Sequence, residues 1–240
     1  MTHFLVPEPA APVAPGPVPT FSVIIACYQA ADTVGEDAGQ LVNMLFGNTS
    51  LQDDCVLADV ELPTELLTAF GGPRAGLAAL RQRLNVPNRA FAGSALKPQG
   101  MPVEKLAALA GRFAEGGLDF VKDDHGLADQ RYSPAAERIP RCAEAIERAS
   151  RRTGHRTRYI PSLSGDLDSM RVQLRSAVDA GVDCAMIAPA IAGFATMHRL
   201  ARAFPDVVFF AHPAYGGAAR VAPDLLIGAL FRLLGAGGVI

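Results

Sequence analysis

Three short segments place ionisable side chains directly after an apolar run. Lys97 ends the first segment and is followed by Pro98, which a helix interior does not accept. The second segment is Lys122–His125, and the third ends in His212. If the apolar runs are parallel strands of one sheet, their carboxyl ends meet at one edge, where α/β folds carry out their chemistry. These residues are therefore the candidates for a functional site.

The run Lys122–His125 has the pattern of a metal site. Alternate residues of a strand face the same side, so Lys122 and Asp124 share one face. A lysine that has reacted with CO₂ becomes an anionic oxygen ligand, and beside an aspartate it suits Mg²⁺. The same spacing also fits a plain ion pair at a strand end, and the residues alone leave both interpretations open.

Lys97 and the histidines allow similar alternatives. Lys97 fits a residue in the mouth of the sheet, or a side chain that reaches solvent along its alkyl stem. His212 fits substrate contact or proton transfer, or a packed histidine with satisfied hydrogen bonds. The other histidines are expected on the surface. His3 lies in a tail, His155 follows a helix end, and His198 lies on a helix.

The elements that must position these candidates alternate regularly after residue 90. Apolar runs occupy Ala90–Leu96, Leu118–Lys122, Thr157–Pro161, Asp183–Ala188 and Val207–Ala211, and helical patterns occupy Val103–Glu115, Ala135–Thr153, Asp168–Ala180, Phe194–Ala203 and Pro223–Leu234. Repeated strand–helix units predict parallel strands with helices outside. A sixth strand is expected at Gly238–Ile240. The expected fold class is α/β: a partial TIM (β/α)8 barrel of about five to six βα units that lacks the C-terminal units.

The residues before the barrel units have a different character. Residues 7–19 carry six prolines and predict an extended tail, and the apolar run Phe21–Ala26 predicts a strand. Val56–Leu62 alternates and predicts a half-buried strand, whereas Pro63–Phe70 and Gly76–Leu84 predict helices. We divide the chain into a Pro-rich tail with one strand (1–36), a remnant that leads into the barrel (37–89) and an incomplete barrel (90–240).

Composition argues against several classes of protein. Lys and Arg number 22 against 24 Asp and Glu, so the net charge of −2 disfavours nucleic acid or a membrane surface as a partner. Hydrophobic residues make up 50% of the chain, enough for a sizeable core. No apolar run has the length of a membrane span, and no basic secretory signal opens the chain. Four widely spaced cysteines without a CxxC pair predict a reducing cytoplasm.

Residues 93–130 strongly resemble the first two barrel units of the RuBisCO large-chain superfamily. The likeness lies in the strand ending LKP, the strand GGLDFVKDD, and the helix residues Arg138, Cys142 and Ala145, which follow in the family's order and spacing. The stretch LVNMLFGNTSL, at 41–51, and HPAYGG, at 212–217, extend the resemblance over roughly residues 39–240.

The resemblance implies a magnesium site. Lys122 corresponds to the lysine that CO₂ carbamylates, and Asp124 to an aspartate ligand of Mg²⁺. His125 stands at the position of the family's glutamate ligand and replaces one oxygen ligand by an imidazole. A divalent ion would polarise a ketone and stabilise the enediolate that forms from it.

The resemblance also implies roles toward a substrate. Lys97 corresponds to the residue that assists removal of the proton next to the substrate carbonyl. Asn48 would face the metal and the substrate, and His212 would contact a hydroxyl or carbonyl oxygen. The implied substrate is a phosphorylated sugar derivative, and the implied assembly is a homodimer.

Departures from the carboxylase pattern favour the RuBisCO-like (form IV) branch. Besides His125, Gln99 replaces the second lysine of the KPK motif, Pro213 replaces an arginine and Pro161 replaces an asparagine. Members of this branch enolise, isomerise, decarboxylate or transcarboxylate phosphorylated keto-sugar derivatives. The form KDDHGLADQ is similar to that of members assigned to apionate-type sugar-acid catabolism.

Residues 19–36 resemble the opening strand of a family 2 glycosyltransferase instead, and nothing after them continues that likeness. Three functions stay open: Mg²⁺-dependent enolate chemistry, a non-catalytic misassembled fragment, and glycosyl transfer. The absent strands predict exposed apolar edges and lost neighbours for Phe120, Ile160, Met186 and Phe210. We therefore expect no measurable enolase-type turnover from this chain and a tendency to aggregate or oligomerise.

Overall fold

A computed structural model describes residues 32 and 34–240. Strands and helices alternate after residue 90 in the order β1 (Gly93–Leu96), α5 (Val103–Glu115), β2 (Phe120–Asp123), α6 (Ala135–Thr153), β3 (Arg158–Ile160), α7 (Leu167–Asp179), β4 (Cys184–Ile187), α8 (Pro189–Ala192), α9 (Phe194–Ala203) and β5 (Val208–Ala211). Two short helical segments follow, η2 (Gly216–Ala219) and the π-helical η3 (Asp224–Leu230), and then α10 (Phe231–Leu233) and β6 (Ala236–Val239). The predicted strand–helix units and the sixth strand are thus present.

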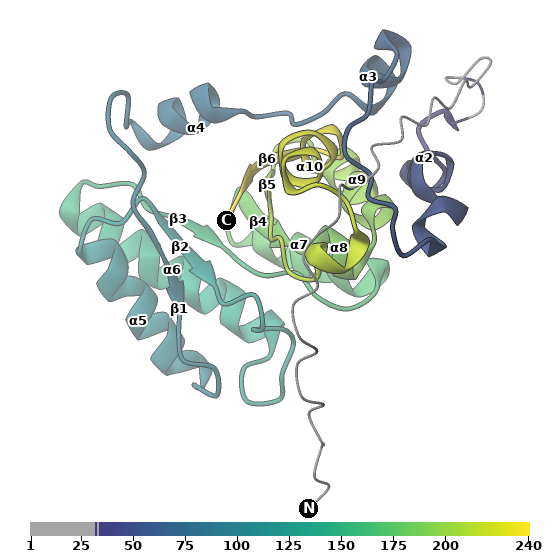
Figure 1. The fold of residues 1–240 in the computed structure, drawn as a ribbon. Coiled ribbons are helices and arrows are strands. Elements are labelled where there is room, and N and C mark those ends of the chain that lie inside the picture. Colours follow the sequence, from purple (N-terminus) through teal and green to yellow (C-terminus); the bar gives the residue numbers. More distant parts are fainter. Residues whose placement is uncertain (1–31, 33) are drawn as a thin grey trace, which may run out of the picture.

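The six strands are parallel and follow one another in chain order (Figure 1). Hydrogen bonds join β1-β2-β3 into one set and β4-β5-β6 into another. Between the sets, Met186 N donates to Pro161 O at 2.8 Å and Leu163 N donates to Met186 O at 2.8 Å. The two sets therefore continue as one curved sheet, and the expected partial (β/α) barrel is confirmed.

The inner side of this sheet is filled at the amino-terminal ends of the strands. The four side chains predicted to lose their neighbours are each at most 6% exposed: Phe120, Ile160, Met186 and Phe210. They form one apolar cluster with Leu80 and Leu84 of α4 (Leu77–Leu84) and with Phe91. That expectation is wrong, because α4 precedes the barrel in the chain and packs over its interior.

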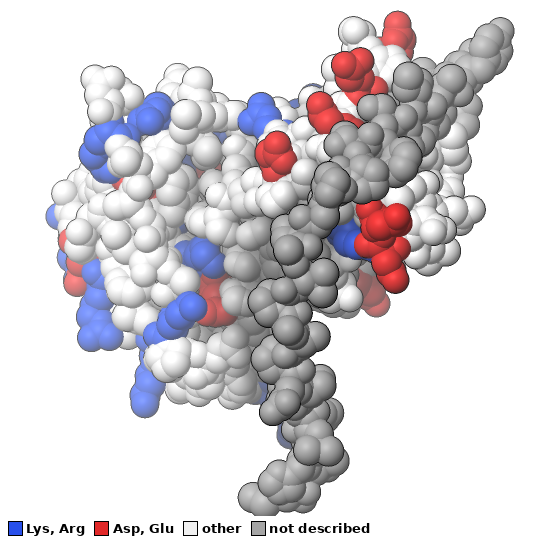
Figure 2. Space-filling view, in the orientation of Figure 1, with Lys and Arg blue, Asp and Glu red and all other residues white. Residues whose placement is uncertain are grey.

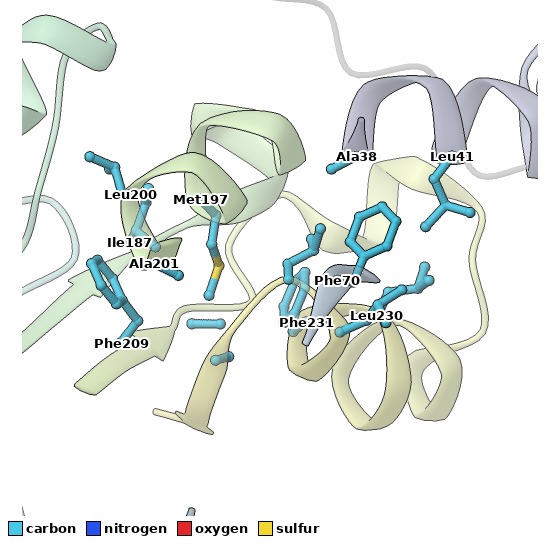
Figure 3. Packing of buried hydrophobic residues seen from close by; sticks show 14 of the residues in the cluster. Ala38, Leu41, Phe70, Ile187, Met197, Leu200, Ala201, Phe209, Leu230 and Phe231 are labelled. Carbon is cyan, nitrogen blue, oxygen red and sulfur yellow. The ribbon is translucent and has the colours of Figure 1, made fainter. Parts of the chain in front are cut away.

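Two further apolar clusters lie on the outer side of the sheet. One joins α5 and α6 to β1, β2 and β3. The other joins α2 (Ala38–Phe46) and α3 (Thr64–Phe70) to α9, η3, α10 and the strands β4 and β5. Figure 3 shows Leu41 and Phe70 beside Leu230, with Phe231 close by. The helices that come before the barrel are therefore part of its packing.

The segment between α2 and α3 does not form the strand predicted at 56–62. It contains η1 (Asn48–Leu51), and beyond that only Leu57 pairs, in a single parallel bridge with Val221. Arg220 donates to the carbonyl oxygen of Gln52 at 2.6 Å and to that of Ser50. The alternating pattern fails as a strand because, among the residues that the structure describes, no other strand lies alongside it to complete a ladder.

Charged side chains are unevenly spread over the surface. On the face in Figure 2, acidic side chains gather mainly near α2 and α3 and basic ones mainly near α4, α5 and α6, with wide uncharged stretches between them. None of the described helices is long and apolar enough to cross a membrane. Cys142 and Cys184 are buried, and Cys55 is partly exposed.

Most of the first proposed division of the chain cannot be compared with the structure. The Pro-rich tail, the strand at Phe21–Ala26 and the glycosyltransferase-like residues 19–36 lie outside the described residues, apart from positions 32 and 34–36. The boundaries 1–36, 37–89 and 90–240, and the cytoplasmic location, stay predictions.

Candidate functional site at the carboxyl ends of the strands

The carboxyl ends of β1, β2 and β5 bring four candidate side chains together. Lys97 Nζ lies 3.1 Å from Asp124 Oδ2. His125 Nδ1 lies 3.4 Å from Asp124 Oδ1, and the His125 ring stacks on the ring of His212 with centroids 4.4 Å apart. Pairing of β1 with β2 sets this geometry: Leu96 lies opposite Asp123, so the residues that follow them, Lys97 and Asp124, both enter the mouth.

Lys122 faces the interior of the sheet, as the alternation of strand residues predicts. Its Nζ donates to its neighbour's carbonyl oxygen, Asp123 O, at 3.2 Å and lies 3.7 Å from Met186 Sδ on β4. Burial lowers the pKa of Lys122, and the carboxylate of Asp124 opposes that shift. A lowered pKa raises the share of neutral amine, which is the form that reacts with CO₂.

Asp124 is held as a carboxylate by the donors around it. Its Oδ1 accepts from Gly126 N at 2.9 Å and from Gln99 Nε2 at 3.4 Å. Burial by itself raises the pKa of Asp124, but the Gly126 N–H, Lys97 and Gln99 lower it to about 2. A Cβ at Gly126 would lie 2.0 Å from Gln99 Nε2, so glycine is needed there for Gln99 to reach the carboxylate.

His212 presents a hydrogen-bond donor to the mouth. Its Nδ1 accepts from Ala214 N at 3.1 Å, so in the neutral ring the proton sits on Nε2. Burial lowers the pKa of His212, and the neighbouring His125 and Lys122 lower it further. The ring therefore stays neutral near pH 7 and can donate to an oxygen atom of a ligand.

Asp123 lies on the opposite face of β2 and belongs to a buried network that sequence analysis missed. Its carboxylate accepts from Tyr159 Oη at 2.7 Å, Ser162 N at 3.1 Å and Arg138 Nε at 3.2 Å. Arg138 is fully buried and also donates to Ser133 O at 2.5 Å. An arginine within the apolar stripe of α6 was the available signal, because a buried guanidinium needs a carboxylate partner.

The remaining candidates lie elsewhere. Asn48 is exposed at the start of η1 and, within the described residues, makes no hydrogen bond or ion pair with the cluster. His198, expected on the surface, is buried with its ring 4.8 Å from that of Phe70. His155 Nε2 lies 3.3 Å from Asp119 Oδ1 at the amino-terminal end of β2. Between residues 34 and 240, no three His, Cys, Asp or Glu side chains group as a metal site.

Comparison with known proteins agrees with this fold. The sequence pattern of the ribulose bisphosphate carboxylase large chain, catalytic domain, matches residues 76–234. A 5-methylthioribulose-1-phosphate isomerase of Rhodospirillum rubrum is 56% identical over 209 residues, which cover 87% of this chain and 56% of that protein. Ribulose bisphosphate carboxylase-like protein 1 of Rhodopseudomonas palustris is 49% identical over 228 residues, 95% of this chain and 61% of that protein.

A solved structure gives the same result. The crystal structure of a Rubisco-like protein from Rhodopseudomonas palustris superposes with a TM-score of 0.84 at 50% identity, covering 87% of this chain and 59% of that one. The chain thus spans less than two thirds of the length of these relatives. It belongs to the RuBisCO large-chain superfamily, as a RuBisCO-like protein.

Proposed function

We propose that this site serves the metal-assisted enolisation of a phosphorylated keto-sugar derivative in the intact protein. The observation that carries the proposal is the convergence of Lys97, Asp124 and His212 beside Lys122 at the carboxyl ends of three strands. The name of the Rhodospirillum rubrum relative supplies the substrate, 5-methylthioribulose 1-phosphate, and the reaction, an isomerisation. This substrate takes the place of the sugar acid that the KDDHGLADQ form suggests.

The side chains fit a magnesium ion held by a carbamate on Lys122 and by Asp124. Asp124 offers an ionised carboxylate, and the amine of Lys122 has the lowered pKa that carbamate formation needs. His125 fits less well, because imidazole is a poor ligand for Mg²⁺ and its ring is stacked on His212. When bound, the ion supplies a Lewis acid that makes the proton next to a ketone more acidic.

The side chains of the chain supply the proton transfers. Lys97, as the neutral amine, takes the proton from the hydroxyl-bearing carbon next to the carbonyl and returns it to the former carbonyl carbon. The proton of that hydroxyl passes to the other oxygen, which completes an isomerisation. His212 donates its Nε2–H to the substrate oxygen on which negative charge develops. Half-exposed Lys97 and His125 line the open side of the mouth, where a ligand can enter.

The test uses a chimaera, because this chain covers only part of its relatives. Residues of this chain replace the matched segment of the Rhodospirillum rubrum protein, and deuterium uptake into 5-methylthioribulose 1-phosphate is measured in D₂O with Mg²⁺ and bicarbonate. We expect uptake by the chimaera and a loss of about two to four orders of magnitude for Lys97→Met. Lys105→Met, on the exposed side of α5, is the matched control and should leave the rate unchanged.

A chimaera that folds cooperatively but takes up no deuterium would refute the proposed function. The 240-residue chain is assayed in parallel, where the expectation is no measurable turnover. Sedimentation of the chimaera tests the homodimer that we propose for the intact protein. If the chimaera is inactive while the chain binds a partner protein, the non-catalytic alternative gains support.

A further inference from the structure

Both carboxylate oxygens of Asp124 are already engaged. Oδ2 pairs with Lys97 Nζ at 3.1 Å, and Oδ1 accepts from Gly126 N at 2.9 Å and Gln99 Nε2 at 3.4 Å. The side chain of Asp124 is only 7% exposed, whereas that of Lys97 is 64% exposed. The two partners of this ion pair therefore differ sharply in their freedom to move.

A divalent cation and the ammonium of Lys97 compete for the same oxygen. Two cations in contact with Oδ2 repel each other strongly, because salt does not screen charges a few ångströms apart. The Gly126 N–H is held beside Oδ1 by the chain itself, since it lies only two residues farther along the sequence. Lys97 is the group with solvent around it, so it is the group that a cation displaces.

We infer that Lys97 is metal-gated: a divalent cation binding at Asp124 expels the Lys97 ammonium from its ion pair into the mouth, where substrate lies. The inference rests on the proposed metal site and adds an order of events, in which cation loading precedes the release of Lys97 from Asp124. The coupling is reciprocal, so the ion pair weakens cation binding by the same factor by which the cation weakens the pair.

The gate predicts that removing the Lys97 charge strengthens cation binding. Mn²⁺ binding to the 240-residue chain is measured by electron paramagnetic resonance in the presence of bicarbonate and without substrate. We expect Lys97→Met to bind Mn²⁺ about two- to fivefold more tightly than wild type, the scale of an exposed ion pair. Lys97→Arg keeps the charge and should bind Mn²⁺ no more tightly than wild type. Added NaCl should reduce the difference in Mn²⁺ affinity between Lys97→Met and wild type.

A second measurement follows Lys97 directly. The chain has three lysines, Lys97, Lys105 and Lys122, so lysine-selective ¹³C labelling gives three side-chain signals. Lys97→Met and Lys105→Met assign two of them. We expect Mg²⁺ to shift the Lys97 signal and to leave the Lys105 signal in place, because Lys105 lies on the exposed side of α5.

Equal Mn²⁺ affinity in wild type and Lys97→Met would overturn the gate, and so would the absence of Mn²⁺ binding in both. The gate would also be overturned if Mg²⁺ left the ¹³C signal of Lys97 unshifted. Thermal unfolding of each variant confirms that it is folded. None of these measurements involves turnover, so a chimaera without deuterium uptake would end the proposed reaction and leave the gate to be judged on its own data.

Discussion

The two ends of the strands differ in how they are packed and in how exposed their charged side chains are. At the amino-terminal end, α4 covers an apolar interior. The charged side chains there form ion pairs, such as Arg89 with Asp119 and Arg158 with Asp183. At the carboxyl-terminal end, Lys97 and His125 are half-exposed or more, and two lysines face one carboxylate on the inner side of β2. The amino-terminal end is thus a packed interior, and the carboxyl-terminal end holds ionisable groups at the edge where α/β folds carry their sites.

The comparison is sharpest within β2 itself. Asp123 and Asp124 are adjacent, yet Asp123 points toward α6 and is locked by Arg138 and Tyr159, while Asp124 points into the mouth. Alternation along a strand thus places two identical side chains in different surroundings, Asp123 in a buried network and Asp124 in the mouth.

Removing Arg138 should have the largest effect on stability. Arg138→Met leaves Asp123 buried without its guanidinium, and breaking such a pair costs about 3–5 kcal/mol of unfolding free energy. Urea unfolding measures the loss, and Arg141→Met on the exposed side of the same helix is the control. A loss below about 1 kcal/mol would mean that the network does not hold the carboxyl-terminal end in place.

A cavity at the amino-terminal end of the strands should have the second-largest effect on stability. Leu80→Ala removes a buried side chain of α4 from the interior cluster and should cost about 2–5 kcal/mol. Leu77→Ala, exposed on the same helix, should cost far less. Because the two ends are separate, Mn²⁺ affinity of the folded Leu80→Ala protein should equal that of wild type. A changed affinity would break the separation of the two ends.

Acid should weaken the amino-terminal end through Asp119. Burial opposes the shift, but hydrogen bonds from Arg89 and Ala92 N hold the pKa of Asp119 below its usual value. A depressed folded-state pKa means that this stabilisation is complete above the unfolded-state value of about 3.9 and is lost as the pH falls below it. Urea midpoints between pH 5 and pH 3 should fall less steeply for Asp119→Asn than for wild type or Asp206→Asn. Equal slopes would contradict the assignment.

Lys122→Met should have the smallest effect on stability. A partly buried amine is replaced by an apolar side chain next to Met186, so the unfolding free energy should stay level or rise by about 1 kcal/mol or less. The same change should abolish the carbamate signal that ¹³C-bicarbonate gives in nuclear magnetic resonance. A clear loss of stability would show that Lys122 serves packing rather than chemistry.

Local patterns predicted most of the fold. Helices α5, α6 and α9 begin and end at the predicted residues, because periodic apolar positions mark all three and a glycine follows the last residue of α5 and of α6. The approach of Lys97 to Asp124 also followed from sequence, since consecutive parallel strands place their carboxyl ends together.

Contacts between segments far apart in the chain could not be predicted from local sequence patterns. The spacing of Leu77, Leu80 and Leu84 predicts a helix but does not say that it docks over the interior. The alternation at 56–62 predicts a strand, yet a strand needs a neighbour that the pattern cannot supply. Arg138 and Asp123 lie 15 residues apart, and only the packing of α6 on β2 reveals them as a pair.

The contact of Arg220 with the segment near Ser50 bears on how the chain is made. The two partners of the Arg220–Gln52 hydrogen bond lie 168 residues apart, so a ribosome must release all the residues between them before the bond can form. Closing so long a loop is entropically costly, and the strands and helices between them form from nearer neighbours. During synthesis, residues 48–57 therefore remain open to chaperones and proteases until the region around Val221 has emerged and folded back onto them.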